Sequence, residues 1–307
     1  MDGQKTAFLR RFFVRENSMV KYIVMKNIKV KCPAKINLTL EIVNKRDDGF
    51  HNINSIMQLI SLYDYLDISV ELADTNKILL SGNNPNIPYD ERNLVYKAAD
   101  LFFKELNIEG FCVRVNIEKN IPIAAGLAGG STDAAGTLLG LNKLFDDIFS
   151  KVELHQLCAK LGSDLNVCLE GGCLYATSRG EKIERLPVVS MPVTLIKPKM
   201  LGISAKEAYT KYSLKKDKPK YHNTEKMIEA LKYGNDIKQF LYNDLEYAVF
   251  EDYKELQIIK EKYPESIMSG SGSTYFILEN LQKSDLPDDY QIISNLCFIS
   301  NGCSVVN

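Results

Sequence analysis

A glycine-rich stretch, residues 120–136, is the part of this 307-residue chain whose residue types best suit binding chemistry. Alternating apolar residues before it predict a strand over 111–117, and apolar residues at helical spacing follow over 134–145. The order of strand, glycine loop and helix brings backbone N–H groups and the positive end of the helix dipole to one point, which suits phosphate. We expect Ser131 or Thr132 to be the N-cap, with hydroxyls able to bond phosphate oxygens or a metal-bound water.

The same stretch lacks two common nucleotide signatures. It contains neither G-x-x-x-x-G-K-[ST] nor G-x-G-x-x-G, which argues against a Walker loop and against a dinucleotide fingerprint. Glycine turns before helices are common, so a tight turn capped by Ser or Thr is the alternative on the glycines alone.

A lysine and an aspartate elsewhere in the chain have side chains suited to proton and phosphoryl chemistry. Lys35 belongs to an alternating run, 28–42, that predicts a strand with Lys35 and Asn37 on the same face. Asp164 follows Gly162, which marks the end of a predicted helix. Taken alone, a solvated strand lysine and a turn aspartate would explain both residues.

Five segments in order resemble the GHMP kinases, the superfamily that includes galactokinase, homoserine kinase and mevalonate kinase. They are 33–38, 48–51, 122–135, 162–165 and 269–274. The resemblance runs from about residue 26 to the end of the chain.

This resemblance implies an α+β fold with two domains. A ribosomal protein S5 domain 2-like N-terminal domain would span 26–187, and a ferredoxin-like C-terminal domain would span 190–307, with 1–25 as an N-terminal extension. Apolar patterning also predicts separate strands over 55–60 and 65–72.

The resemblance also implies the roles of individual residues. Lys35 and Asp164 would be catalytic, and ATP and Mg²⁺ would be the cofactors, with no protein side chain assigned to the metal. The residues expected to bind ATP are Asn93, Lys119, Pro122, Ile123, Ala124, Ala125, Gly126, Leu127, Ala128, Gly129, Gly130, Ser131 and Thr132. The residues expected to bind the acceptor are Asn37, Phe50, His51, Ser271 and Gly272. For Asn93, an N-cap is an equally good explanation.

Segment 48–51 resembles the branch that phosphorylates the 2-hydroxyl of 4-diphosphocytidyl-2-C-methyl-D-erythritol in the non-mevalonate isoprenoid pathway. Phe50 would stack on cytosine, and His51 would read the edge of the base. The alternatives are a GHMP kinase for mevalonate or homoserine, and a non-catalytic nucleotide-binding sensor. Asn166 stands where the family usually has proline, and we expect it to loosen the backbone beside Asp164.

Composition limits the partners and the compartment. The net charge is −1 and no apolar run approaches ~18 residues, which argues against a nucleic-acid surface and a membrane span. Seven cysteines without a C-x-x-C pair and three scattered histidines argue against a disulfide framework and a structural zinc site. We expect a cytoplasmic enzyme that acts on a small molecule, as a monomer or weak homodimer.

Overall fold

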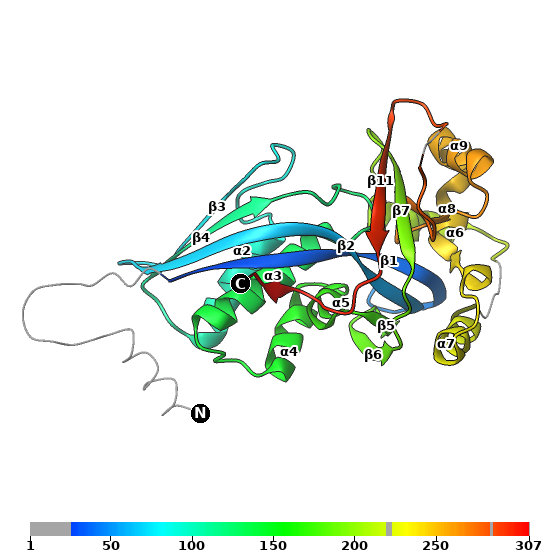
Figure 1. Cartoon of the computed structure of the whole chain (residues 1–307). Helices are drawn as coiled ribbons and strands as arrows, with labels where there is room; N and C mark the ends of the chain where they lie inside the picture. The colour runs from blue at the N-terminus through cyan, green and yellow to red at the C-terminus, as the bar shows by residue number, and fades with distance from the viewer. Residues whose placement is uncertain (1–25, 219–222, 283–284, 307) are drawn as a thin grey trace, which may run out of the picture.

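The computed structural model describes residues 26–218, 223–282 and 285–306, and these form two sheets with helices packed against them (Figure 1). The predicted extension, residues 1–25, lies outside the described residues. None of the helices described is at once long enough and apolar enough to span a bilayer.

The larger sheet has eight strands, and most of its pairings are antiparallel. Its order is β12-β1-β2-β4-β3, with β8 paired to β1, and with β5 paired to β2 and β6. Its strands are β1 (Lys26–Lys45), β2 (His51–Leu72), β3 (Lys77–Gly82), β4 (Phe111–Glu118), β5 (Cys173–Ser178), β6 (Lys182–Leu186), β8 (Tyr242–Asn243) and β12 (Ser304–Val305). The long strands β1 and β2 run through the middle of the molecule and carry Lys35, Asn37 and His51 of the site described below (Figure 1).

The two runs predicted as separate strands form the single strand β2. Its register against β1 shifts at one point, where Pro33 faces Tyr63 but the next residue, Ala34, faces Ile60. Proline has no N–H to give to the ladder, and a bulge opposite it lets the pairing continue on both sides.

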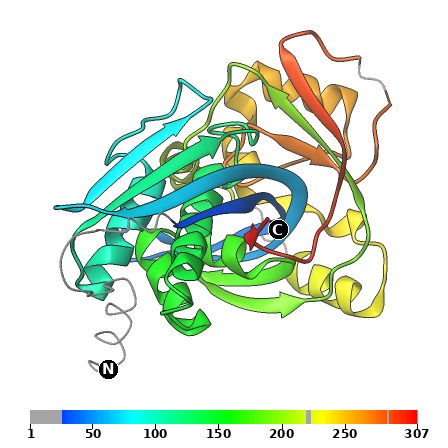
Figure 2. The same cartoon turned by 60° about the vertical axis from the view of Figure 1, so that its left-hand side comes forward.

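Helices α2 (Leu94–Leu106), α3 (Gly129–Leu144), α4 (Lys151–Leu161) and α5 (Leu165–Glu170) lie on one side of the larger sheet (Figures 1 and 2). The predicted apolar face of α3 is fully buried at Ala134, Leu138, Leu141 and Phe145. Burial of such side chains stabilises the fold by roughly 1.5–3 kcal/mol for each large residue. This packing fixes α3, and therefore the glycine loop that precedes it, against the sheet.

The smaller sheet has four antiparallel strands in the order β11-β7-β10-β9. They are β7 (Pro192–Pro198), β9 (Ile267–Met268), β10 (Tyr275–Ile277) and β11 (Tyr290–Cys297). The accompanying helices are α6 (Ala205–Leu214), α7 (Asn223–Tyr233), α8 (Asp244–Val249) and α9 (Lys254–Lys262), with short 3₁₀ turns at Lys238–Phe240 and Phe250–Asp252. The predicted two-domain α+β fold is confirmed, since neither sheet is a doubly wound parallel sheet.

The two parts of the chain are not cleanly separated at the predicted boundary. β8 and β12 come from the predicted second domain, 190–307, yet both pair with β1. Val30 and Lys31 of β1 face Val305 and Ser304, so the C-terminus returns to the first sheet (Figure 2). Sequence patterns missed β12 because a two-residue strand has no alternation to detect.

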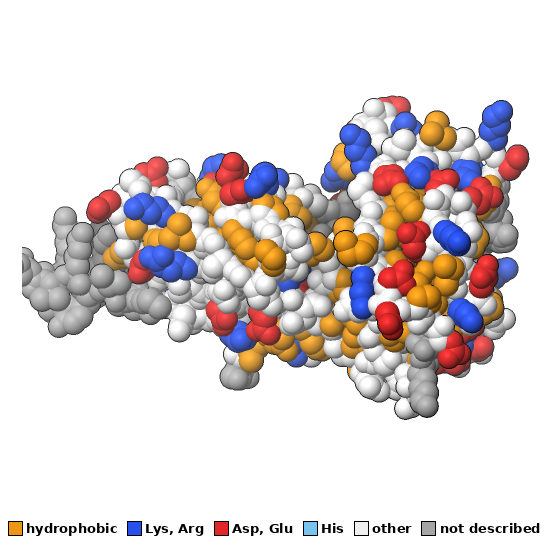
Figure 3. Space-filling view, turned by 90° about the horizontal axis from the view of Figure 1, so that it is seen from above, with side chains coloured by type: hydrophobic (Ala, Val, Ile, Leu, Met, Phe, Trp, Pro, Cys, Tyr) orange, Lys and Arg blue, Asp and Glu red, His pale blue; other side chains and the backbone are white. Residues whose placement is uncertain are grey.

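On the face in Figure 3, a notch separates the part of the molecule built on the larger sheet from the part built on the smaller sheet. Positive and negative side chains are interspersed on this face, in keeping with the net charge of −1.

Candidate active site

Lys35 and Asp164 lie side by side, although they are far apart in the sequence. The distance from Lys35 Nζ to Asp164 Oδ2 is 3.6 Å. The Lys35 side chain on β1 is 4% exposed, whereas Asp164, at the start of α5, is 29% exposed. The fold therefore brings together the two residues that were predicted to be catalytic, with the carboxylate on the solvent side.

Two further acceptors orient the Lys35 ammonium. It donates to Asn37 Oδ1 at 2.7 Å and to the carbonyl of Gly126 at 3.0 Å. The buried Asn37 in turn donates to the hydroxyl of Ser55 at 2.9 Å. These bonds let Asn37 position the lysine, and its expected contact with the acceptor stays a prediction.

The glycine loop enters α3 earlier than expected. The helix begins at Gly129, and its N-cap is Ala128, which has a left-handed backbone (φ 58°) and makes no side-chain cap bond. The expectation that Ser131 or Thr132 is the N-cap is wrong, because both lie in the first turn. The positive φ of Gly126 and Ala128 turns the chain into the helix without a side-chain cap.

The two hydroxyls of this first turn differ in access. Ser131 is half-buried, while Thr132 is fully buried with its Oγ1 3.5 Å from Cys303 Sγ. Gly130 is exposed. The first N–H groups of α3 and the Ser131 hydroxyl are thus the part of the loop that an anion can reach.

A second glycine-rich loop, 269–274, meets the first one beside Lys35. A Cβ on Gly126 (φ +74°) would lie 2.0 Å from the carbonyl oxygen of Ser269, so only glycine fits there. The Ser269 hydroxyl donates to the Gly126 carbonyl at 3.0 Å. From the other side, Asn243 Nδ2 donates to the carbonyls of Met268 and Gly270 at 2.6 and 2.8 Å.

Ser271 and Gly272 occupy the turn of this second loop. The Ser271 hydroxyl donates to the carbonyl of Ile203 at 3.2 Å, and Gly272 has a positive φ of 88°. Their expected contacts with the acceptor stay predictions.

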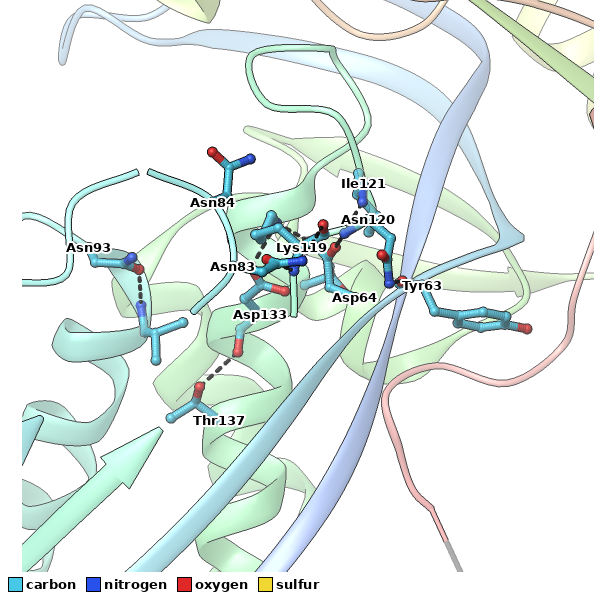
Figure 4. A network of polar contacts seen from close by, with 12 residues as sticks. Tyr63, Asp64, Asn83, Asn84, Asn93, Lys119, Asn120, Ile121, Asp133 and Thr137 are labelled. Carbon is cyan, nitrogen blue, oxygen red and sulfur yellow. Dashed lines mark hydrogen bonds and ion pairs between the residues drawn. The ribbon is translucent and has the colours of Figure 1, made fainter. Parts of the chain in front are cut away.

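Lys119 is enclosed in a buried network instead of facing the loop opening (Figure 4). Its Nζ donates to Asp64 and, at 2.8 Å, to Asp133 Oδ2, and a Cβ on Gly129 would lie 3.0 Å from it. Asp64 also accepts the N–H groups of Asn120 and Ile121 at 2.6 and 2.8 Å. Lys119 thus supports the glycine loop from beneath through its carboxylate partners, and its expected contact with ATP stays a prediction.

Burial and neighbouring charges change the pKa values of Lys119 and Asp133 in this network. Burial would lower the pKa of Lys119, but the two carboxylates raise it on balance, so the lysine stays charged. Burial raises the pKa of Asp133 to about 7, and the nearby Asp64 adds to this against the opposing effect of Lys119. Asp133 Oδ1 has no hydrogen-bond partner among the described residues.

Asn93 is the N-cap of α2 (Figure 4). Its Oδ1 accepts the N–H of Val95 at 2.9 Å and its Nδ2 donates to the carbonyl of Pro88 at 2.7 Å. Of the two explanations for Asn93, the cap is the one observed, and the nucleotide contact stays a prediction.

Phe50 and His51 lie where β2 begins, on the open side of the site. Phe50 is 53% exposed, and the guanidinium of Arg179 lies 5.1 Å from the centre of its ring. The His51 ring stacks on Tyr209 at 5.0 Å between centroids. An exposed aromatic ring beside a histidine suits a flat base.

The hydrogen bonds of His51 define its tautomer. Ser213 Oγ donates to the carbonyl of Tyr209 at 2.9 Å and therefore accepts from His51 Nε2 at 3.1 Å. Burial, and then the charges of Lys45 and Lys218, lower the pKa of His51 and favour the neutral ring. Nδ1 of the neutral ring is then an acceptor.

Tyr209 lies in the stretch 203–209, where acceptor contacts of the second domain were expected from the sequence without any one residue being assigned. It lies on α6, a helix that was not predicted, and its ring faces His51 from the second domain. The apolar pattern over 205–214 is too weak to predict a helix there. Only the fold brings Tyr209 to His51.

The expectation that Asn166 loosens the backbone beside Asp164 stays a prediction, but the side chain of Asn166 is itself held in place. Asn166 lies in the first turn of α5 and its buried side chain bonds to both Glu181 and His155. These side-chain hydrogen bonds hold Asn166 in place, whereas its backbone lacks the fixed φ of a proline.

A cavity of about 480 Å³ lies apart from this site, against α8 and α9. It is lined by Tyr242, Asn243, Glu246, Tyr247, Phe250, Glu251, Lys260, Pro264 and Ile267. Two of its polar side chains, Glu246 and Lys260, pair with each other at 3.1 Å.

Comparison with known proteins defines the class first. The family model described as the GHMP kinases N terminal domain matches residues 93–173, which contain α3 and its loop. A homoserine kinase structure from Cytophaga hutchinsonii has a TM-score of 0.70 at 17% identity, over 95% of this chain and all of that one, which speaks for the fold. The fold and the loop beside Lys35 are those of a GHMP kinase.

Closer relatives define the family. A 4-diphosphocytidyl-2-C-methyl-D-erythritol kinase from Thermoanaerobacter pseudethanolicus is 39% identical over 282 residues, covering 88% of this chain and 95% of the relative. A crystal structure of 4-(cytidine 5'-diphospho)-2C-methyl-D-erythritol kinase has a TM-score of 0.69 at 29% identity, over 89% of this chain and all of that one. This chain belongs to the 4-diphosphocytidyl-2-C-methyl-D-erythritol kinase family.

Proposed function

We propose that this enzyme transfers the γ-phosphoryl group of ATP to the 2-hydroxyl of 4-diphosphocytidyl-2-C-methyl-D-erythritol. The observation that carries the proposal is the Lys35–Asp164 pair, 3.6 Å apart and tied to the glycine loop through the Gly126 carbonyl. The substrate is taken from its relatives, which are kinases of this cytidyl compound.

Asp164 and Lys35 have complementary roles in this reaction. The hydroxyl oxygen attacks the γ-phosphorus, the bond from that phosphorus to the β–γ bridging oxygen breaks, and ADP leaves. Asp164 accepts a hydrogen bond from the hydroxyl and takes its proton as the new bond forms. Lys35 stabilises negative charge at the same point, as phosphoryl transfer depends on positioning and electrostatics.

The phosphates of ATP would lie at the N-terminus of α3. The helix dipole, its first N–H groups and the Ser131 hydroxyl favour an anion there. Within the described residues, no group of three or more His, Cys, Asp or Glu side chains is arranged to hold a metal ion. Mg²⁺, the expected cofactor, would neutralise phosphate charge on ATP at this place.

The cytidine end of the acceptor would lie at Phe50 and His51. Cytosine presents an amino group as a donor, and Nδ1 of neutral His51 is a matching acceptor. Phe50 offers its exposed ring for stacking, and Arg179 places a cation near the path of the acceptor diphosphate.

One assay tests the proposal against its alternatives. Purified protein with Mg-ATP is offered the cytidyl acceptor, mevalonate and homoserine in parallel, and Asp164→Asn serves as the control. We expect ADP release and a phosphorylated product with the cytidyl acceptor only. Turnover of mevalonate or homoserine instead, or ATP binding without turnover of any acceptor, would overturn the proposal.

A further inference from the structure

Asn166, in the first turn of α5, joins three parts of the chain through its amide. Its Nδ2 donates to the backbone carbonyl of Glu181 at 2.9 Å, and its Oδ1 lies 3.1 Å from Nδ1 of His155 on α4. His155 Nε2 lies 3.0 Å from Glu170 Oε2. Asn166 is only 6% exposed, so water competes little for these bonds.

The donors and acceptors of this chain of bonds allow one assignment. A backbone carbonyl only accepts, so the Asn166 amide must present its NH₂ to Glu181 and its oxygen to His155. His155 Nδ1 must then donate, and Nε2 faces a carboxylate that also only accepts. His155 therefore bridges the Asn166 amide and the Glu170 carboxylate.

Glu170 ends this chain of bonds and also pairs with two cations. Burial would raise the pKa of Glu170, but its bonds to Lys151, Arg185 and His155 lower the pKa to about 2. Lys151 lies 2.8 Å from Glu170 Oε2, and Arg185 Nε donates to Glu170 Oε1 at 2.6 Å. The carboxylate thus stays ionised and holds the His155 ring in one orientation.

The hydrogen bond from Asn166 to the Glu181 carbonyl connects α5, which begins after Asp164, to the part of the site where the acceptor is proposed to bind. Asp164 is the N-cap of α5, two residues before Asn166. The Glu181 carbonyl belongs to the turn between β5 and β6, where Arg179 lies over Phe50 and its N–H bonds to the Glu181 carboxylate at 2.9 Å. A Cβ on Gly180, in the same turn, would be 3.4 Å from Ser163 Cβ, so the two segments are in contact.

We propose that Asn166 and His155 are positioning residues that hold Asp164 at a fixed distance from the acceptor-binding turn at Arg179 and Phe50. Neither touches substrate. The proposal rests on the proposed function, because it assigns the acceptor to Phe50 and the base to Asp164. Its consequence is that losing the Asn166 amide affects the acceptor and the chemical step but leaves ATP binding alone.

Steady-state kinetics of Asn166→Ala provides the first test. We expect kcat to fall about tenfold, since small misplacements of catalytic groups are costly. KM for the cytidyl acceptor should rise several-fold while KM for ATP is unchanged. Asn166→Asp should be impaired as well, because it keeps the bond from His155 but sets a carboxylate oxygen against the Glu181 carbonyl.

His155→Phe keeps a planar ring and removes both bonds. As in Asn166→Ala, kcat should fall and KM for the cytidyl acceptor should rise. The double variant with Asn166→Ala should be no worse than Asn166→Ala alone, because both residues act through one chain of hydrogen bonds. Long-range ¹H–¹⁵N NMR of the wild-type protein should show the proton on His155 Nδ1 that the bond to the Asn166 oxygen requires, and His155→Phe removes this signal.

Asn142→Ala is the matched control. Asn142 is also buried and bonds the backbone of Phe149 twice at 2.9 Å, but it lies near the far end of α3. It should lower the melting temperature while leaving kcat and the acceptor KM unchanged.

Two results would overturn the proposal alone: Asn166→Ala with wild-type kinetics, or a His155 ring without a proton on Nδ1 in the NMR spectrum. A wild-type protein that cannot phosphorylate the cytidyl acceptor would overturn the proposed function and this inference together.

Discussion

At the scale of single residues, Asp164 and Lys35 make the clearest prediction. Asp164→Asn keeps the shape of the side chain but removes its charge and its ability to take a proton. We expect kcat to fall by about 10²–10⁴-fold, the usual range for a general base, with little change in KM for either substrate. Steady-state kinetics with both substrates varied measures this.

Lys35→Met should lower kcat as well, because it removes positive charge beside the reacting hydroxyl. Combined with Asp164→Asn, its effect should be less than the product of the two, since the side chains act at one point. Melting curves of all three variants control for unfolding. Near-normal kcat in Asp164→Asn would leave the mechanism without its base.

His51 makes a prediction about specificity. His51→Ala removes the Nδ1 acceptor and the ring stacked on Tyr209, which should cost on the order of 1–3 kcal/mol of acceptor binding. Calorimetric titration with the cytidyl acceptor and separately with ATP measures both affinities. Equal losses for both ligands would contradict the assignment of His51 to the base.

The same residue should give acceptor binding a simple pH dependence. The lowered pKa of His51 keeps the ring neutral at and above neutral pH, so Nδ1 remains an acceptor there. Acceptor affinity should be flat above neutral pH and weaken on acidification, and His51→Ala should lack this acidic loss.

At the scale of elements, the buried network beneath the phosphate loop has a pH signature. Asp133 has a raised pKa of about 7 in the folded protein, against about 3.9 unfolded. Between these values the folded state holds the proton and the unfolded state has lost it, so this group makes stability fall as pH rises.

Asp133→Asn tests this sign. It removes the titrating group and leaves Lys119 paired with Asp64. Relative to Asp133→Asn, the wild-type protein should lose roughly 1–3 kcal/mol of unfolding free energy between pH 5 and pH 7. Urea unfolding of both proteins across that range measures the difference, and parallel pH profiles would show that Asp133 is ionised throughout.

The elements themselves were largely predictable where their patterns are long. β4, α2, α3 and the β5–β6 hairpin follow from alternation or helical spacing that burial confirms. The N-cap of α3 was not predictable, because the left-handed backbone of Ala128 sets the start of the helix and no side chain caps it. A capping side chain leaves a trace in the sequence, whereas a backbone turn of this kind does not.

Of the site, individual residues could be predicted from the sequence, but their surroundings could not. Motif resemblance named Lys35 and Asp164, which the fold places together, but it could not reveal that Lys119 is enclosed by Asp64 and Asp133. Those contacts join strands and a helix that are distant in the sequence. Side-chain surroundings of this kind depend on the tertiary fold.

At the scale of the whole molecule, the C-terminal segment connects the two halves of the chain. After the second sheet, the chain returns so that β12 pairs with β1 (Figure 2). Cys303 donates its N–H to the carbonyl of Cys168 on α5 at 2.9 Å, and its thiol lies against Thr132 on α3. One short segment thus supports both the helix that follows Asp164 and the first turn of the phosphate helix.

Truncation after Asn301 therefore makes the last prediction. It removes the β12 pairing, the Cys303 contacts and the bond from Val306 N–H to the Lys29 carbonyl at 2.8 Å. Each hydrogen bond contributes about 1 kcal/mol, and about 1 kcal/mol corresponds to a few degrees in a chain of this size. We expect the melting temperature to fall by several degrees and KM for ATP to rise, because Thr132 loses its packing partner. A protein lacking only Asn307 serves as the control and should match the full chain. If the longer truncation also matches the full chain in melting temperature and KM for ATP, the C-terminal segment does not support the phosphate helix.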